Sequence, residues 1–225
     1  KQGNQAQARG LVNAILRKIQ TAELDHILDK IDDQITRLSI ETSHPQWLLT
    51  KWMERYDYEQ VLSLCQHNNM PPVMWVRHNT LKVSKQDFEA YLDREEVDFS
   101  QSDLLNSFYK VERVAGLINT PEFRDGWFSF QDIAAGIVAS IVDPQEDEII
   151  LDACAAPGGK MSYLSELSKG KANIIACDAS QTRLLKVNQN IDRLGLMNID
   201  VRHLNAAVDE SPQAHRILLD VPCSG

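Results

Sequence analysis

The stretch Asp152-Ala-Cys-Ala-Ala-Pro-Gly-Gly-Lys160 decides the fold, because it follows the apolar run 148–151 and breaks it with one proline and two glycines. A strand that ends in such a turn and opens a helix leaves the first N–H groups of that helix without partners. Gly158 and Gly159 have no side chains, so a ligand can approach the backbone there. The stretch therefore predicts a strand, a ligand-binding turn and a helix whose N-terminus favours an anion.

The residues after 148 alternate between strand and helix patterns. We predict strands over 148–152, 172–178, 199–204 and 216–221, and helices over 160–168 and 181–194. Ser180 is suited to cap the second helix and Gly195 to end it. Such alternation indicates a parallel, doubly wound α/β sheet, in which ligands bind at the carboxyl ends of the strands.

Asp178 ends the second of these strands, one strand along from the glycine-rich turn. A carboxylate at that place can accept hydrogen bonds from both hydroxyls of a ribose, which indicates a nucleoside cofactor. The turn lacks the GxGxxG pattern of dinucleotide sites and the GxxxxGK[ST] pattern of P-loops. S-adenosylmethionine fits better, with its methionyl end near Gly158 and Gly159 and its ribose at Asp178.

Two motifs, DACAAPGGK at 152–160 and DVPCSG at 220–225, together resemble the Nol-Nop-Sun family of RNA cytosine methyltransferases, and within it the bacterial Sun/Fmu (RsmB) type. The resemblance implies an α/β fold with a Rossmann-like methyltransferase sheet, incomplete in this chain, preceded by a small α+β module and helices. It also implies S-adenosyl-L-methionine as the cofactor, 16S ribosomal RNA of the small subunit as the partner, and 5-methylcytosine as the product.

The resemblance assigns roles to residues on the turn and at the strand ends. Cofactor binding falls to Cys154, Ala155, Ala156, Pro157, Gly158, Gly159, Lys160, Asp178, Arg183, Asn205 and Asp220, and catalysis to Cys223, Asp220 and Lys160. Asn205 stands where relatives carry an Asp that accepts a hydrogen bond from the adenine amino group, and its side-chain oxygen can still accept one. Asp220 is expected near the transferring methyl group and the cytosine edge.

The chemistry requires a cysteine, because carbon 5 of cytosine takes up a methyl group only after a thiolate adds at carbon 6. Cys223 is the obvious nucleophile by analogy with DNA cytosine methyltransferases. The resemblance to the RNA family implies instead that a later cysteine attacks, while the Pro-Cys residue assists release of the RNA. The sequence has no cysteine after Cys223. We therefore expect a piece of a longer protein that binds cofactor but does not turn over.

Three parts are expected along the chain. Residues 1–20 resemble the closing helix of a NusB-like RNA-binding domain, although a plain surface helix fits equally well. We expect residues 21–125 to form helices and a small α+β RNA-binding module. Residues 126–225 are expected to be the amino-terminal part of the catalytic domain. In the strand predicted over 73–78, Arg77 and His78 are either contacts to RNA phosphate or ordinary exposed residues. Gln131 and Asp132 lie either near the active site, as in the family, or simply at a helix N-terminus.

The composition sets broad limits. The formal net charge of −9 argues against a chain that grips nucleic acid over its whole surface, but a local basic patch remains compatible with it. The four cysteines show no CxxC spacing, so neither a metal site nor a disulfide framework is expected. The polar start and the lack of a long apolar run favour a cytoplasmic protein without membrane contact.

Two alternatives stay open at this point. One is a sister family that methylates transfer RNA. The other belongs to a different class, a non-catalytic RNA-binding or assembly protein that keeps the methyltransferase fold as a scaffold.

Overall fold

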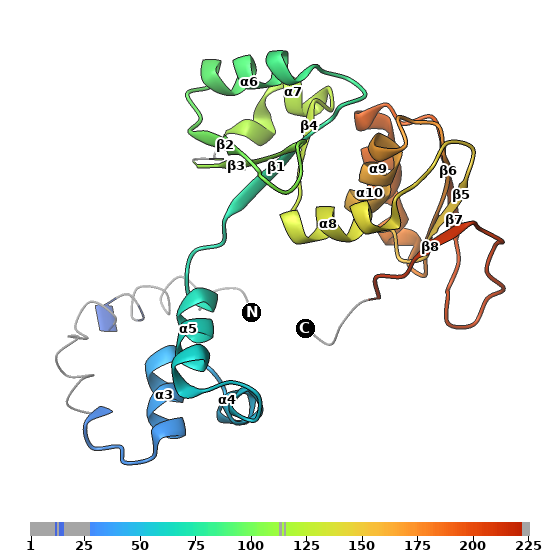
Figure 1. Cartoon of the computed structure of the whole chain (residues 1–225). Coiled ribbons are helices and arrows are strands. Elements are labelled where there is room, and N and C mark those ends of the chain that lie inside the picture. Colours follow the sequence, from blue (N-terminus) through green and yellow to red (C-terminus); the bar gives the residue numbers. More distant parts are fainter. Residues whose placement is uncertain (1–11, 13, 16–27, 113, 115, 222–225) are drawn as a thin grey trace, which may run out of the picture. The chain divides into compact units, whose positions relative to one another are not determined.

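The computed structural model describes residues 12, 14–15, 28–112, 114 and 116–221 (Figure 1). The chain divides into two compact units, Lys1–Pro72 and Val73–Gly225. Nearly all of the helix expected within residues 1–20, together with Cys223, lies outside the described residues.

The described part of the first unit, from residue 28 onward, contains three helices, α3 (Gln34–Thr42), α4 (Gln46–Met53) and α5 (Tyr58–Asn68). Asp33 begins α3 by accepting a hydrogen bond from the Thr36 backbone N–H, and Asp57 and Gln60 form a capping box at the start of α5. The helices share a small buried core of Leu38, Leu49, Val61 and Cys65.

The second unit starts with a small antiparallel sheet. Its strands are β1 (Met74–His78), β2 (Phe99–Gln101), β3 (Phe108–Val111) and β4 (Phe128–Phe130), in the order β2-β3-β1-β4. Helices α6 (Lys85–Arg94) and α7 (Pro121–Arg124) lie beside this sheet, with a short 3-10 turn, η1 (Leu117–Asn119), before α7 (Figure 1). Their aromatic side chains pack on it in a core that includes Phe88, Tyr91, Tyr109 and Phe128.

The strand expected over 73–78 is confirmed as β1. The strand β4 pairs with β1 although it follows Gly126, where we placed the start of the catalytic part. The chain thus passes from the smaller sheet toward the larger one after Phe130.

The larger sheet is parallel, with the order β7-β6-β5-β8. Its strands are β5 (Ile149–Asp152), β6 (Asn173–Asp178), β7 (Ile199–His203) and β8 (Arg216–Leu218), each close to a predicted strand. Figure 1 shows α8 (Ile133–Val142), α9 (Gly159–Leu167) and α10 (Gln181–Leu194) gathered on one side of it. Ile150, Ile174 and Ala176 face the core shared with these helices, while Leu151, Ile175 and Cys177 belong to a second cluster.

Side chains tie the two sheets together within this unit. Arg193, near the end of α10, donates to the carbonyls of Phe123 (2.7 Å) and Phe128 (2.9 Å) in the smaller module. Gly126 allows a close approach there, since an added Cβ would stand 2.1 Å from the Arg193 carbonyl oxygen. The predicted cap and stop of α10 are confirmed: Ser180 accepts from the Arg183 N–H, and Gly195 is left-handed.

Candidate active site

The glycine-rich turn lies between the end of β5 and the start of α9. Gly158 has φ +108°, a conformation that residues with side chains rarely adopt, and it leaves α9 without a side-chain cap. The Ala155 N–H donates to the Cys177 carbonyl (2.7 Å), and the Ala156 N–H donates to Asp178 Oδ2 (3.3 Å). The turn is therefore held against β6, with bare backbone at its tip.

A cavity of about 460 Å³ opens at this turn, near the carboxyl ends of β5 and β8. Its volume lies within the range of small-molecule sites. Eight of the residues assigned from the sequence line it, namely Cys154, Ala155, Ala156, Pro157, Gly159, Lys160, Arg183 and Asp220; the others in its wall are Phe130, Gln131, Ala135, Asp152 and Val221. Gly158, Asp178 and Asn205 do not line it, and Cys223 is outside the described part of the chain.

Asp178 lies buried behind the turn. Its Oδ1 accepts from the Ser180 N–H (2.9 Å), its Oδ2 accepts from the Ala156 N–H, and Arg183 Nη1 stands 3.4 Å from Oδ2. An ionised carboxylate offers about four lone-pair positions, so capacity for a ligand hydroxyl remains. The ribose-binding role of Asp178 stays a prediction.

Asn205 is exposed, and its Oδ1 accepts a hydrogen bond from the Ala207 N–H (3.1 Å) in its own loop. Its adenine-binding role likewise stays a prediction.

Charged groups converge at the cavity wall. Lys160 and Asp220 form an ion pair between the first turn of α9 and the segment after β8. Asp152 lies beside them with its Oδ2 free of any partner among the described residues, and burial raises the pKa of this carboxyl to about 7. Sequence reasoning assigned no role to Asp152, although its place at a strand end is where ligand-binding residues of such sheets are found.

The environment of Arg77 differs from both expectations for this residue. The sequence left it as a phosphate contact or an exposed residue, and both readings are wrong because its side chain is fully buried. Its guanidinium donates to the Gly159 carbonyl (2.8 Å), Ser162 Oγ (2.8 Å), Glu166 Oε1 (2.9 Å) and Gln131 Oε1. Arg77 belongs to β1, so the smaller sheet supports the first turns of α9.

His78 is also buried, so neither sequence reading holds for it. Its ring stacks on Phe88, and its Nε2 donates to the Val83 carbonyl (2.8 Å). Burial lowers the pKa of this imidazole, which keeps it neutral. A neutral buried histidine is not a phosphate ligand, so its role is structural.

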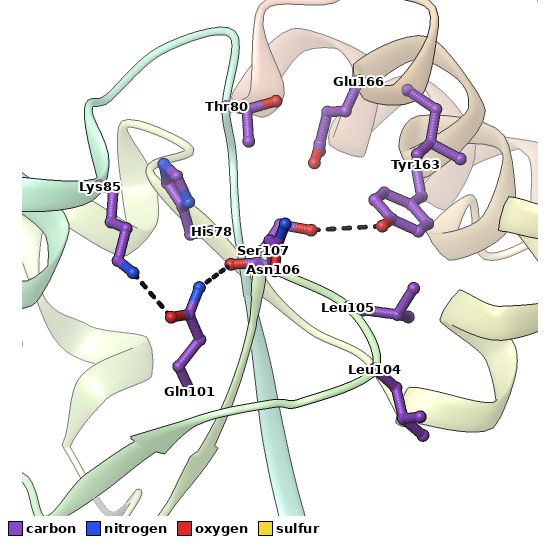
Figure 2. A pocket seen from close by; sticks show the side chains of 11 residues that line it. His78, Thr80, Lys85, Gln101, Leu104, Leu105, Asn106, Ser107, Tyr163 and Glu166 are labelled. Carbon is purple, nitrogen blue, oxygen red and sulfur yellow. Dashed lines mark hydrogen bonds between the residues drawn. The ribbon is translucent and has the colours of Figure 1, made fainter.

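A larger cavity, of about 650 Å³, lies between the smaller sheet and α9 (Figure 2). Figure 2 shows Glu166 and Tyr163 reaching into it from α9, with Ser107 Oγ donating to the Tyr163 hydroxyl (3.3 Å). The glycine-rich turn and the Lys160–Asp220 pair are not part of its wall. The smaller cavity is therefore the better candidate for chemistry.

Two thiols lie near the turn. Cys177 is fully buried and packs in the sheet, whereas Cys154 faces the cavity. Burial raises the pKa of both thiols, which favours the protonated form. Neither is an activated nucleophile.

Among the described residues, no group of three or more His, Cys, Asp and Glu side chains is arranged to hold a metal ion. In the same part of the chain, no helix combines the length and the apolar character that crossing a membrane requires.

Two models of known protein families match parts of this chain. The model of the 16S rRNA methyltransferase RsmB/F family matches residues 139–225, and that of the RsmF/B-like ferredoxin-like domain matches residues 44–113. The chain is 34% identical over 218 residues to the probable ribosomal RNA small subunit methyltransferase B of Bacillus subtilis, covering 95% of this chain and 48% of that protein. It is 34% identical over 222 residues to the Proteus mirabilis ribosomal RNA small subunit methyltransferase B, covering 97% and 51%.

The chain thus spans about half the length of these relatives. A crystal structure of a methyltransferase homolog protein from Pyrococcus horikoshii superposes with a TM-score of 0.75 at 26% identity, covering 87% of this chain and 65% of that one. The expected Rossmann-like methyltransferase fold is thereby confirmed. The resemblance seen in the two sequence motifs is confirmed as well, and the chain belongs to the Sun/RsmB family of methyltransferases.

Proposed function

We propose that this chain binds S-adenosyl-L-methionine and forms part of an enzyme that methylates carbon 5 of a cytosine in 16S ribosomal RNA. One observation carries the proposal: the uncapped glycine-rich turn, the buried Asp152 and the Lys160–Asp220 pair meet in one cavity of about 460 Å³. The names of the relatives, which act on small-subunit ribosomal RNA, support the choice of RNA.

The residues at the turn fit this cofactor. Gly158 and Gly159 leave room for its methionyl end, and the buried Oδ2 of Asp152 is an acceptor without a partner among the described residues. Asp178, held behind the turn by Ala156 and Arg183, would bind the ribose hydroxyls in this proposal. When bound, the cofactor supplies an electrophilic methyl group.

Lys160 and Asp220 act on the cytosine in this proposal. The Lys160 ammonium holds the Asp220 carboxylate at the cavity, where a carboxylate can accept a hydrogen bond from the cytosine amino group. Phe130, Ala135 and Val221 supply apolar side chains to the wall of the same cavity. Cys223 would assist release of the methylated RNA, as the family resemblance implies.

The RNA approaches the cavity from a side other than α6. The acidic residues between 87 and 103 repel phosphate, which disfavours the surface around α6 and β2 as an RNA contact. We propose that residues 1–20 and other surfaces within 21–125 bind RNA. We also propose that residues 126–225 form the amino-terminal part of the catalytic domain.

Calorimetric titration of S-adenosyl-L-methionine into the chain tests the cofactor site. Asp178→Ala should weaken binding by about tenfold or more, since it removes the acceptor for two ribose hydroxyls. Asp200→Ala is the matched control, because Asp200 lies exposed on β7 and pairs with Arg202 away from the cavity. Equal affinities for the two variants would contradict the assignment of Asp178.

The reaction is tested with the protein that the complete gene encodes. Incubation with small-subunit ribosomal RNA and tritiated S-adenosyl-L-methionine should place the label in 5-methylcytosine after digestion to nucleosides. Label in another nucleoside, or none in the RNA, would refute the proposed reaction while leaving the cofactor site intact.

A further inference from the structure

Gln131 holds a polar atom without a partner at the wall of the cofactor cavity. The residue is about nine-tenths buried, and its Nε2 has no hydrogen-bond partner among the described residues. Its Oε1 accepts from Arg77. Arginine has donors only, so the oxygen of the Gln131 amide must face Arg77 and the nitrogen must face away from it.

The free nitrogen of Gln131 lies beside the glycine-rich turn. A Cβ added to Gly159 would stand 3.6 Å from Nε2, and Gly159 is itself part of the cavity wall. Because Gly159 has no side chain, no Cβ lies between the turn and this amide. A buried donor without a partner lowers the stability of the folded protein, and a ligand that supplies an acceptor would remove this cost.

Arg77 cannot turn away from Gln131. Its guanidinium is held by the Gly159 carbonyl, by Ser162 Oγ and by the Glu166 carboxylate, and it lies 4.9 Å from the centre of the Tyr163 ring. Together with Gln131, these partners hold both Nη groups of the planar guanidinium. The orientation of the Gln131 amide is thus set from the smaller sheet, through a residue that does not line the cavity.

The ligand group that fits here is a carboxylate. The N-terminus of α9 has no side-chain cap, so its free N–H groups and its dipole favour an anion, and the Gln131 nitrogen adds a further donor on the same side. An ammonium group would place donor against donor at Nε2. A carboxylate near the turn accepts from both sets of donors.

We propose that Gln131 binds the carboxylate of the methionyl end of S-adenosyl-L-methionine, and that Arg77 is the positioning residue that presents its amide nitrogen. This inference rests on the proposed cofactor. It makes the smaller sheet part of the cofactor site, because cofactor affinity then depends on a strand that lies outside the methyltransferase sheet.

The test compares two ligands that share adenosine and an uncharged sulfur. S-adenosylhomocysteine carries the amino acid carboxylate, whereas 5′-methylthioadenosine lacks it, and both are titrated calorimetrically into the chain. Gln131→Met should weaken binding of S-adenosylhomocysteine by about tenfold or more, the cost of losing a hydrogen bond to a charged group, and leave methylthioadenosine binding unchanged.

Arg77→Lys tests the positioning role. Lysine keeps a positive charge near Glu166 but cannot reproduce the planar fork of donors, so the same selective loss is expected. A merely structural role of Arg77 would instead weaken both ligands alike. Gln101→Met is the matched control, since Gln101 lies at the larger cavity, and it should change neither affinity.

The outcomes separate this inference from the proposed function. If the unaltered chain binds both ligands and Gln131→Met keeps their affinity ratio, the carboxylate contact is refuted and the cofactor site stands. If the unaltered chain binds neither ligand, the proposed function fails and the inference fails with it.

Discussion

The buried pair of Arg77 and Glu166 should make the second unit sensitive to the loss of either partner, and in different ways. Both side chains are almost completely buried, and the Nη2 and Oε1 atoms are 2.9 Å apart. Glu166→Met leaves a guanidinium that cannot lose its proton, whereas Arg77→Met leaves a carboxyl that can take one up. We therefore expect Glu166→Met to be the more damaging change near neutral pH.

The magnitude follows from the cost of an unpaired buried charge. Removing one partner of a buried ion pair costs about 3–5 kcal/mol, which for a unit of this size corresponds to a loss of roughly 10 °C in melting temperature. The double variant should be less damaged than the sum of the single variants, because no charge is left behind.

The pH dependence gives the sharper result. Burial raises the pKa of Glu166 to about 7, so this group favours the folded state below its unfolded pKa and loses that contribution as pH rises toward 7. Without Arg77 the folded pKa moves higher still, so stability keeps falling above pH 7. The deficit of Arg77→Met should grow by about 1.4 kcal/mol per pH unit there.

Urea unfolding of the single and double variants at pH 6, 7 and 8 measures these terms. The deficit of Glu166→Met should shrink between pH 6 and 7, where the unaltered chain loses the Glu166 contribution, and change little above pH 7; the opposite trends of the two single variants are the internal control. Single variants that each cost under about 1 kcal/mol, as for an exposed pair, would refute this account of the pair. So would additive effects in the double variant.

Two further predictions concern other sites. Gly126→Ala should destabilise the chain far more than Gly170→Ala in thermal unfolding: both glycines have φ above +70°, but an added Cβ would stand 2.1 Å from backbone at Gly126 and meet nothing within 4 Å at Gly170. Gly170→Ala should cost only the conformational term of about 1–2 kcal/mol, and equal losses would contradict the close contact. Asp152→Asn should gain stability relative to the unaltered chain as pH rises from 5 to 8, because burial raises the pKa of Asp152 to about 7 and ionising it opposes folding. A difference between the two proteins that does not change with pH would contradict this burial.

Much of the larger sheet could be predicted because its signals are local. Apolar runs ending in Asp152 and Asp178, the turn at Gly158 and the stop at Gly195 each follow from a few neighbouring residues. The strands β2, β3 and β4 were not predicted. They are three or four residues long, and β3 and β4 pair with the distant strand β1, which no local pattern encodes.

The candidate site divides in the same way. The sequence by itself determined the glycine-rich turn, most of the cavity wall and the place of Lys160 and Asp220 in that wall, because strand ends in a parallel sheet meet at one edge. The ion pair between these two side chains is known only from the tertiary structure. Only the tertiary structure decided that Arg77 is buried and that the Gln131 amide nitrogen is left free. Those facts depend on contacts across 54 to 89 positions of the chain, and such contacts exist only once β1 has packed against α9.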